Sequence, residues 1–500
     1  MPDHKESDGN SKEEAVSRRT FLKGLGAAGL VTPAALSGCS DSGSDREADR
    51  DGSTTTDTSR PRNRRPGSDH RPNFLVIVAD DMRYDQLWSM KNVIEHIQKP
   101  GISFTQARCN VPLCQPSRVG MFSGQLSKHH HVIDVGFIQP YVHVDRFIQK
   151  ALANAGYTCG LTGKFVNGID ANGGTAPPDG FTLWREIVID HQKNRFTIRD
   201  EDGLVRPKGI YPTDYYAREA IKFLGEVQEP FALWMTPSEP HSPFTPRANL
   251  AHKFSDYEFK IVDEVDVSDK PPWIQALPPL TPADFKQLEE DARGSLRELA
   301  AVDDMVGQVF DALDPEVLAR TVIFFASDNG VHRGEHRRLG SATKGGPYDV
   351  GLHVPMLVRG PGFEHAPDIS APVLMFQDMA ATMIELSGAT PIMDHQLGVS
   401  LAGIVADPGS QRNRVLLHEI ASPYYTTSGD GITTGPDHEL GFRKLYRYPS
   451  VGSKDKTPPI YEAYDLDTDP DELQNWGNDP TRRAERDRLE KILDDLLAAP

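Results

Sequence analysis

Four short apolar runs organise the central part of the chain, and each ends in polar residues. They are NFLVIVADD (73–81), YTCGLTGKF (157–165), PFALWMTPSEPHSPF (230–244) and TVIFFASDNG (321–330). Runs of this kind, rich in β-branched and aromatic residues, are typical of strands buried on both faces. Helix-like stretches lie between them, the clearest from a Thr281–Pro282 start to Leu313. This alternation predicts an α/β sandwich around a large, mostly parallel central sheet.

The polar ends of these four strands predict one shared crevice. In open parallel sheets, ligands bind outside the carboxyl ends of the strands. A single end rich in Asp, Asn, Gly and Pro could be ordinary turn chemistry. Four such ends on one sheet favour a functional site.

The pattern changes after Gly409. FRKLYRYPS (442–450) and IYEAYDLDTDPDEL (460–473) are typical of short strands separated by turns, and the charged amphipathic segment 482–497 predicts a closing helix. We therefore predict a catalytic domain over residues 73–409 and a smaller C-terminal antiparallel-sheet subdomain over residues 410–500.

The N-terminal segment has the layout of an export signal. SRRTFLK (17–23) places paired arginines before a Gly/Ala-rich stretch, as in twin-arginine signals. LSGC (36–39) resembles a bacterial lipobox, in which Cys39 would carry a lipid. We assign residues 1–39 to this signal and the polar residues 40–72 to a disordered tether. The expected location is the periplasm or cell surface, reached through the twin-arginine machinery, with a lipid on Cys39 as the membrane attachment.

The charge balance limits the partners. With 72 acidic and 54 basic residues the net charge is −18, which argues against general binding to nucleic acid or anionic membrane. No apolar run reaches the roughly 18 residues of a membrane span. An anionic substrate would need a local cluster of cations.

The strand ends supply both metal ligands and cations. Three carboxylates and an amide, which suit calcium or magnesium better than zinc, are Asp80, Asp81, Asp328 and Asn329. Capping and turn hydrogen bonds are the alternative role for these side chains. Cationic or protonatable candidates are Arg118, Lys164, His241, His332, Arg333 and Lys344. Cations beside a metal, on an acidic protein, fit recognition of a tetrahedral anion.

Cys114 stands in PLCQPSRVGMFSG (112–124), where Pro116 suits the first turn of a helix. Cys114 would then begin that helix, where the dipole favours negative charge. A core thiol, a disulfide, a metal ligand and a reaction centre are all open, and the neighbouring clusters favour the reaction centre. We expect Cys109 and Cys159 to be thiols, although an oxidising compartment would permit a disulfide.

Taken together, these motifs resemble a known family. CQPSR (114–118) matches the Cys-x-Pro-Ser-Arg signature of type I, formylglycine-dependent sulfatases of the alkaline-phosphatase-like superfamily, and ADD, GKF, EPH, SDNG and Lys344 follow in the expected order. The resemblance spans residues 73–473, and GKFVN and SDNGVHRGEH are most similar to the N-acetylglucosamine-6-sulfatase-like branch. Many sulfatases have a histidine where this chain has Val166, so the base that releases sulfate is unassigned.

The resemblance implies a mechanism. A formylglycine-generating enzyme would oxidise Cys114 to formylglycine, whose hydrated gem-diol is the nucleophile; one of its oxygens displaces the alcohol and the other then expels sulfate. The implied calcium ligands are Asp80, Asp81, Asp328, Asn329 and the modified Cys114. Arg118 and Lys164 would position and polarise the gem-diol. The implied sulfate-binding residues are His241 and Lys344, with His332 and Arg333 beside them. The resemblance also implies a catalytic role for His241 and Lys344, because one of them, or His332, could protonate the leaving alcohol.

The implied reaction is calcium-dependent hydrolysis of a sulfate ester, such as a sulfated carbohydrate, to inorganic sulfate and an alcohol. Two alternatives stay open at the level of the sequence. A phosphonate or phosphate ester hydrolase could use the same machinery, because phosphate has a similar shape and charge. A sulfated-glycan binding protein would result if Cys114 stayed unmodified.

Overall fold

The computed structural model describes residues 71–136, 142–167, 176–188, 193–396, 398–420, 428–449 and 458–500. The predicted export signal, Cys39 and all but the last two residues of the predicted tether lie outside the described residues. The described residues all belong to one compact unit. Among the described residues, no helix is long and apolar enough to cross a bilayer.

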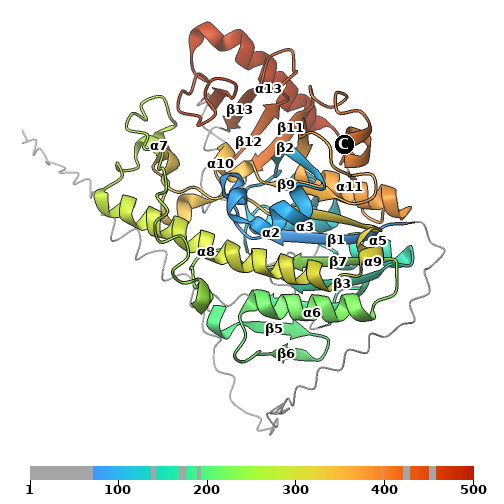
Figure 1. Ribbon diagram of the computed structural model, residues 1–500. Helices are drawn as coiled ribbons and strands as arrows, with labels where there is room; N and C mark the ends of the chain where they lie inside the picture. The colour runs from blue at the N-terminus through green and yellow to red at the C-terminus, as the bar shows by residue number, and fades with distance from the viewer. Residues whose placement is uncertain are drawn as a thin grey trace, which may run out of the picture. The chain divides into compact units, whose positions relative to one another are not determined.

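Ten strands form a large mixed sheet (Figure 1). In spatial order they are β10 (Ile369–Leu374), β2 (Ile102–Arg108), β9 (Met356–Arg359), β8 (Thr321–Ser327), β1 (Asn73–Ala79), β7 (Phe231–Thr236), β3 (Thr158–Gly163), β4 (Phe181–Val188), β5 (Thr197–Asp200) and β6 (Gly203–Val205). The five strands from β8 to β4 are parallel, whereas β9, β5 and β6 pair antiparallel with their neighbours. The predicted mostly parallel sheet is confirmed.

The four apolar runs of the sequence become four adjacent strands, β8, β1, β7 and β3. Their register aligns the strand ends: Ala79 lies opposite Ser327, and Gly163 opposite Thr236. The polar residues that follow therefore leave the sheet side by side. The predicted convergence on one edge is confirmed.

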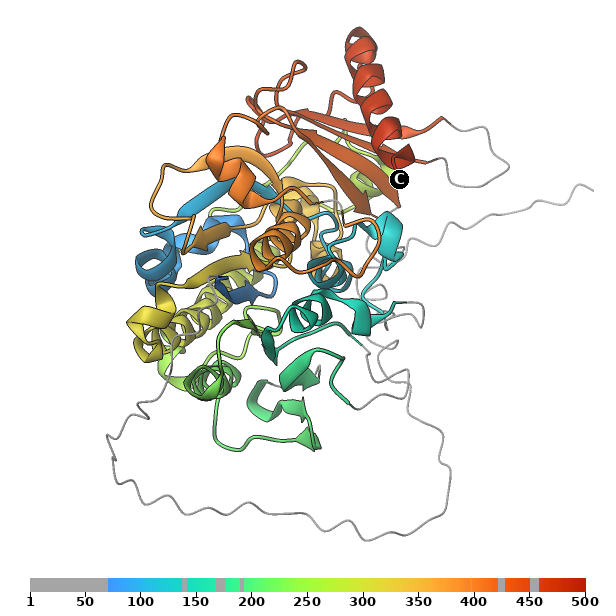
Figure 2. The same cartoon turned by 90° about the vertical axis from the view of Figure 1, so that its right-hand side faces the viewer.

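Side chains of β1 alternate between two cores, as expected for a strand covered on both faces. Phe74, Val76 and Val78 enter one core, while Leu75 and Ile77 enter the other. The helices of the first core are α3 (Cys114–Ser123), α5 (Ile148–Asn154) and α11 (Met375–Ser387); those of the second are α6 (Pro212–Glu226) and α8 (Pro282–Ala312) (Figures 1 and 2). This layering is the predicted α/β sandwich.

Helix α8 begins where the sequence predicts. The Thr281 side chain accepts from the backbone N–H of Asp284, and the Asp284 carboxylate accepts in return from the Thr281 backbone N–H at 2.8 Å. This reciprocal capping box satisfies two of the N–H groups that the first turn leaves unpaired.

A second sheet of four antiparallel strands follows in the C-terminal part. Its strands, in order, are β11 (Val415–Ile420), β12 (Gly429–Thr434), β13 (Arg443–Tyr448) and β14 (Ile460–Asp465). The closing helix α13 (Arg483–Ala498) packs against this sheet (Figure 2). It buries Leu489 and Leu493 in the same apolar cluster as Leu445. The predicted antiparallel-sheet subdomain is confirmed as an element of the fold.

Shorter helices connect these elements. They are η1 (Tyr84–Ser89), α2 (Lys91–Val93), η2 (Ile94–Gln98), α4 (Ser127–His130), η3 (Val144–Arg146), η5 (Lys193–Arg195), η6 (Ala248–Leu250), α7 (Pro272–Gln275), α9 (Pro315–Leu318), η7 (Glu335–Arg337), η8 (Gly340–Thr343), α10 (Asp349–Leu352), α12 (Leu401–Ala406) and η9 (Pro480–Arg482).

Cys109 and Cys159 are buried free thiols, as expected.

Candidate active site

Cys114 is the first residue of helix α3, as the position of Pro116 predicts. The cysteine is 4% exposed, and all ten residues of the helix are buried. Leu113 precedes it in extended conformation and offers no side-chain cap, so the first backbone N–H groups of the helix lie at the cysteine. A negative charge on the group at position 114 would be stabilised there.

Carboxylates from two neighbouring strands meet in front of this helix. The backbone N–H of Asp81 donates to Asp328 Oδ1 at 3.0 Å, and Asn329 Nδ2 donates to Asp81 Oδ1 at 2.8 Å. Ser117, one turn into α3, donates to the Asp328 carbonyl at 2.6 Å. The ends of β1 and β8 and the start of α3 are therefore joined by direct hydrogen bonds.

Two buried cations lie against these carboxylates. Arg118 donates from Nε to Asp328 Oδ2 at 2.8 Å, and Lys164 donates from Nζ to Asp80 Oδ2 at 2.6 Å. The second arm of Arg118 donates to the Lys164 carbonyl at 2.8 Å. The ends of β1, β3 and β8 thus meet around one arginine of α3.

Gly163 gives Lys164 its position. A Cβ at residue 163 would lie 2.1 Å from the Thr236 carbonyl oxygen, and its φ is +115°. Only glycine allows strands β3 and β7 to approach this closely here. The Lys164 backbone N–H then donates to the same carbonyl at 2.6 Å.

Charge crowding acts in opposite directions on the two carboxylates that face Arg118. Burial raises the pKa of Asp80, but Lys164 and Arg118 outweigh burial and bring it well below the ordinary value. Burial and the neighbouring Asp80 raise the pKa of Asp328 to about 7. The cations therefore keep Asp80 ionised, whereas Asp328 gains and loses its proton close to pH 7.

Lys344 reaches the site from a loop after β8. Its Nζ lies 2.6 Å from Asp81 Oδ2; burial lowers its pKa, but Asp81 and the Cys114 side chain raise it above the ordinary value. The next residue, Gly345, donates to the Pro112 carbonyl at 3.1 Å, which ties this loop to the segment before α3. Arg338 donates to the Lys344 carbonyl at 2.7 Å.

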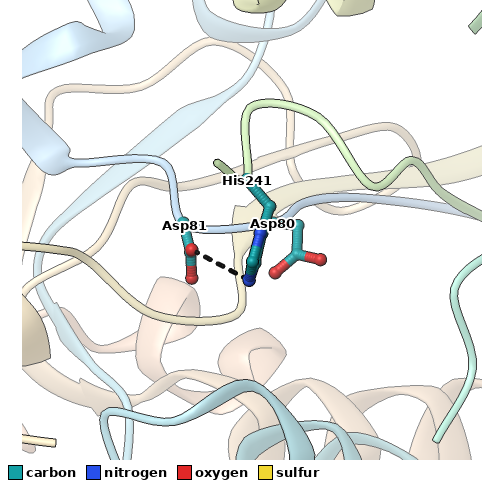
Figure 3. Close-up of side chains that lie close together, drawn as sticks. All are labelled: Asp80, Asp81 and His241. Atoms are coloured by element: carbon teal, nitrogen blue, oxygen red, sulfur yellow. Dashed lines mark ion pairs between the residues drawn. The ribbon is translucent and has the colours of Figure 1, made fainter. Parts of the chain in front are cut away.

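His241 faces the carboxylates from the loop after β7 (Figure 3). Its Nε2 lies 3.6 Å from Asp81 Oδ2. Asp80, Asp81 and His241 each place one possible metal-ligand atom within 4.8 Å of the other two. Burial, assisted by Lys344, lowers the His241 pKa to about 4, so the ring is neutral near pH 7. A neutral imidazole can accept from a proton donor or bind a cation.

His332 and Arg333 are buried in the segment after β8. The backbone N–H and the Nδ1 of His332 both lie 2.9 Å from the Thr343 carbonyl, so this histidine fixes the loop that carries Lys344. Arg333 lies over the ring of Phe244 at 5.9 Å, and burial lowers its pKa to about 10. The structure thus places both residues beside loops that carry site residues; for neither does it give a direct contact with the carboxylates.

The donor set fits a hard cation. Asp80 Oδ1 and Asn329 Oδ1 are buried without a hydrogen-bond partner among the described residues. Buried acceptors of this kind are costly unless a donor or an ion satisfies them. Oxygen donors from carboxylates and an amide match calcium. His241 joins the same group, which the sequence-based prediction had placed with the sulfate-binding residues.

Two supporting residues escape the sequence-based prediction. Gln115, next to the cysteine, exchanges hydrogen bonds with the backbone of Asn167 at 2.5 and 3.2 Å. Lys193 donates to the His241 carbonyl at 2.6 Å. Gln115 occupies the variable position of Cys-x-Pro-Ser-Arg, and Lys193 lies in a stretch without apolar periodicity, so no sequence pattern singles them out.

The layered, mostly parallel sheet has the alkaline-phosphatase-like fold. A protein solved in complex with its substrate D-glucosamine-2-N,6-O-disulfate superposes with TM-score 0.67 at 18% identity, covering 85% of this chain and 97% of that one. The phosphonate monoester hydrolase of Agrobacterium radiobacter superposes with TM-score 0.66 at 20% identity, covering 85% and 95%. Likenesses at this identity establish the fold alone.

The family follows from the sequence comparisons. The Sulfatase family model matches residues 72–389. An arylsulfatase of Volvox carteri is 30% identical over 492 residues, covering 85% of this chain and 74% of the relative. Human N-acetylglucosamine-6-sulfatase is 25% identical over 450 residues, covering 81% of each chain. The chain belongs to the sulfatase family, and its activity is hydrolysis of a sulfate ester.

Proposed function

We propose that this sulfatase is calcium-dependent and that its nucleophile is a formylglycine made from Cys114. The observation that carries the proposal is the position of Cys114 at the first turn of α3, beside Arg118, Lys164 and Lys344. A core cysteine would be surrounded by apolar side chains, as Cys159 is. A group at position 114 instead lies within the electrostatic reach of three cations.

Calcium would be held by Asp80, Asp81, Asp328 and Asn329, next to the group at position 114. When bound, the ion would supply Lewis-acid polarisation of sulfate oxygens, and formylglycine would supply a hydrated aldehyde as nucleophile. The unpartnered oxygens of Asp80 and Asn329 support this assignment.

Two lysines and a neutral histidine of the chain would bind and orient the sulfate ester. Lys344, His241 and Lys164 approach the carboxylates from three different strand ends, so their donors can surround a tetrahedral anion. Lys164 and Lys344 keep raised pKa values and stay charged near pH 7. His241 is neutral, so it can receive a hydrogen bond or hold a proton in transit.

A sulfated carbohydrate is the proposed substrate class. Support comes from the printed names of relatives, such as N-acetylglucosamine-6-sulfatase, and from the solved complex with D-glucosamine-2-N,6-O-disulfate. In this chain the motifs GKFVN and SDNGVHRGEH are similar to that branch. The sugar itself is tested by a panel of sulfated monosaccharides.

Export through the twin-arginine machinery is the proposed route to the periplasm or cell surface. Support comes from the paired arginines Arg18 and Arg19 before a Gly/Ala-rich stretch, and from the LSGC motif ending at Cys39. Replacing both arginines by lysine should keep the protein in the cytoplasm. Normal export of that variant would refute the route.

The experiment that tests the nucleophile is mass spectrometry of the peptide that carries residue 114. The expected result in the active protein is the mass of formylglycine rather than of a cysteine thiol. Full activity with an unmodified thiol would refute the proposal. Rates on an aryl sulfate, an aryl phosphate diester and a phosphonate monoester at equal concentration separate the sulfatase from a phosphonate hydrolase, a fold relative of which is known.

A further inference from the structure

Helix η1 carries two exposed aromatic rings just beyond the site. Tyr84 is 38% and Trp88 is 51% exposed, and they are the only aromatic side chains among the large exposed hydrophobic residues of the described part of the chain. They stand four residues apart on one short helix. Tyr and Trp are enriched at interfaces because each joins a large apolar ring to a polar group.

Tyr84 also lines a cavity of about 420 Å³. The cavity wall comes from the segment after β1, the end of β2, the loop 260–262, the segment after β8 and the C-terminal subdomain. Its residues include Tyr84, Arg108, Lys260, His353, Phe442 and Asp471. The Tyr84 ring is stacked on His353 at 3.9 Å and is thereby held in one orientation. The volume is in the range of small-molecule sites.

The charges around this cavity are largely neutralised in pairs. Arg83 pairs with Asp85 and Glu335, each at 2.8 Å, and Arg108 pairs with Asp349 at 2.5 Å. Burial lowers the pKa of His353 to about 4, so that ring is uncharged near pH 7. A sulfate or phosphate would find no dedicated cation pair there. The wall instead offers hydrogen-bond donors and acceptors beside an aromatic ring.

The loop over η1 extends the aromatic surface. Tyr257 and Phe254 pack against Trp88 with ring centroids 5.5 and 5.9 Å apart, and Phe259 lies under the Arg83 guanidinium at 5.4 Å. The next residue, Lys260, lines the cavity. Trp88 is therefore fixed at its sides and remains half-exposed.

Aromatic faces beside mixed hydrogen-bonding groups suit a neutral sugar ring. The C–H face of a pyranose packs on an aromatic ring, and its hydroxyls both donate to carboxylates and accept from guanidinium groups. Tyr84 is only three residues after Asp81, so their Cα atoms are at most about 11 Å apart. A glycan attached to a sugar in the active site could therefore reach η1.

We propose that Tyr84, Trp88 and the adjoining cavity bind uncharged sugar residues of an oligosaccharide or polysaccharide whose sulfated residue occupies the active site. The proposal rests on the proposed carbohydrate sulfatase function and deepens it, because it makes a glycan chain the substrate rather than a monosaccharide.

The test compares two substrates in the Tyr84→Ala and Trp88→Ala variants. With a tetrasaccharide that carries one terminal 6-O-sulfated glucosamine, we expect kcat/KM to fall about tenfold through a higher KM. With an aryl sulfate, kcat/KM should stay within twofold of the native protein. Tyr84→Phe keeps the ring and should behave as the native protein, and Leu204→Ala, exposed on β6, controls for loss of surface hydrophobicity.

Unchanged kcat/KM for the tetrasaccharide, or equal losses on both substrates, would overturn the proposal. A direct binding measurement tests the glycan site independently of the proposed function. In calorimetry, the desulfated tetrasaccharide should bind the native protein and should bind Tyr84→Ala at least fivefold more weakly. Absence of turnover on every sulfated sugar would refute the carbohydrate sulfatase function, while this binding difference would still support a glycan site. Equal binding by both proteins would refute the site itself.

Discussion

At the scale of single residues, Asp81 adopts a left-handed backbone conformation, with φ +71°. Non-glycine residues in that region cost on the order of 1–3 kcal/mol and cluster at functional sites. Here the unusual backbone lets the Asp81 N–H donate to Asp328 while the carboxylate contacts Asn329 and Lys344. The conformation is held by partners from two other segments.

Replacing Cys114 by alanine should abolish sulfate release and leave the fold intact. The substitution removes one sulfur atom from a buried position, at a cost of about 1 kcal/mol, so Tm should change by only a few degrees. Sulfate release from an aryl sulfate and a thermal melt measure the two effects. Native-like turnover by this variant would place the nucleophile elsewhere.

Asp328→Asn should lose bound calcium together with activity. The amide keeps the shape of the side chain but removes the charge that faces Arg118 and lies next to Asp80. Metal analysis of the purified protein should fall from about one calcium per chain to background. Asp202→Asn, in the exposed turn between β5 and β6, is the matched control and should retain its metal. Full calcium occupancy in Asp328→Asn would exclude a ligand role.

Individual site residues can be predicted from the sequence where a charged residue directly follows an apolar run. Asp80, Lys164 and Asp328 all directly follow apolar runs, so their convergence could be predicted from the direction of parallel strands. Gln115 and Lys193 could not, because they act through backbone contacts that depend on tertiary structure alone. The role of His332 in holding the Thr343 carbonyl also becomes visible only in three dimensions.

At the scale of elements, helices η5 and α8 form a clamp on the loop after β7, which carries His241. Glu298 of α8 accepts from the Lys193 ammonium and, at 2.6 Å, from the Thr245 backbone N–H, while Lys193 donates to the His241 carbonyl. Burial raises the pKa of Glu298 to about 7, although Lys193 opposes this. The clamp therefore fixes both ends of the 241–245 loop from inside the protein.

Lys193→Met should disorganise this loop. It leaves Glu298 buried without its cation, which costs about 3–5 kcal/mol, and kcat/KM on an aryl sulfate should fall at least tenfold. Lys193→Arg should restore much of the stability and much of kcat/KM. A variant with lowered Tm but native kcat/KM would show that the clamp stabilises the fold without positioning His241.

The strands themselves could be predicted because burial on both faces makes them continuously apolar. Their spatial order could not, because β2, β9 and β10 join the sheet through pairings between segments far apart in the sequence. The antiparallel direction of β9 is likewise set by these long-range pairings. The long helix α8 is predictable from its cap, whereas the short helices of three to six residues depend on tertiary contacts.

At the scale of the whole molecule, the C-terminal sheet is bonded to the segment that leads into the active site. Asn110, four residues before Cys114, donates to the Leu417 carbonyl at 2.9 Å and accepts at its own carbonyl from the Glu419 N–H at 3.0 Å. His418 Nδ1 lies 3.1 Å from the Cys109 carbonyl. Strand β11 therefore supports the approach to helix α3, although it belongs to the other sheet.

Two neighbouring residues at this junction, His418 and Glu419, change the free energy of unfolding with pH in opposite directions. Burial lowers the pKa of His418 to about 3, so the folded state loses stability as pH falls from 6.5 toward 3. Burial raises the pKa of Glu419 to about 7, so stability present below pH 4.5 is lost as pH rises toward 7. Each group contributes a slope of about 1.4 kcal/mol per pH unit within its window.

Single substitutions should expose the two slopes separately. In denaturant titrations between pH 4.5 and 6.5, His418→Gln should lower the slope of the unfolding free energy against pH by about 1.4 kcal/mol per unit. Glu419→Gln should raise that slope by a similar amount, because its carboxyl no longer opposes the histidine. The two residues are adjacent on β11, so differences in slope, rather than in absolute stability, isolate the titration from packing. Parallel curves for the native protein and both variants would contradict the assigned charge states.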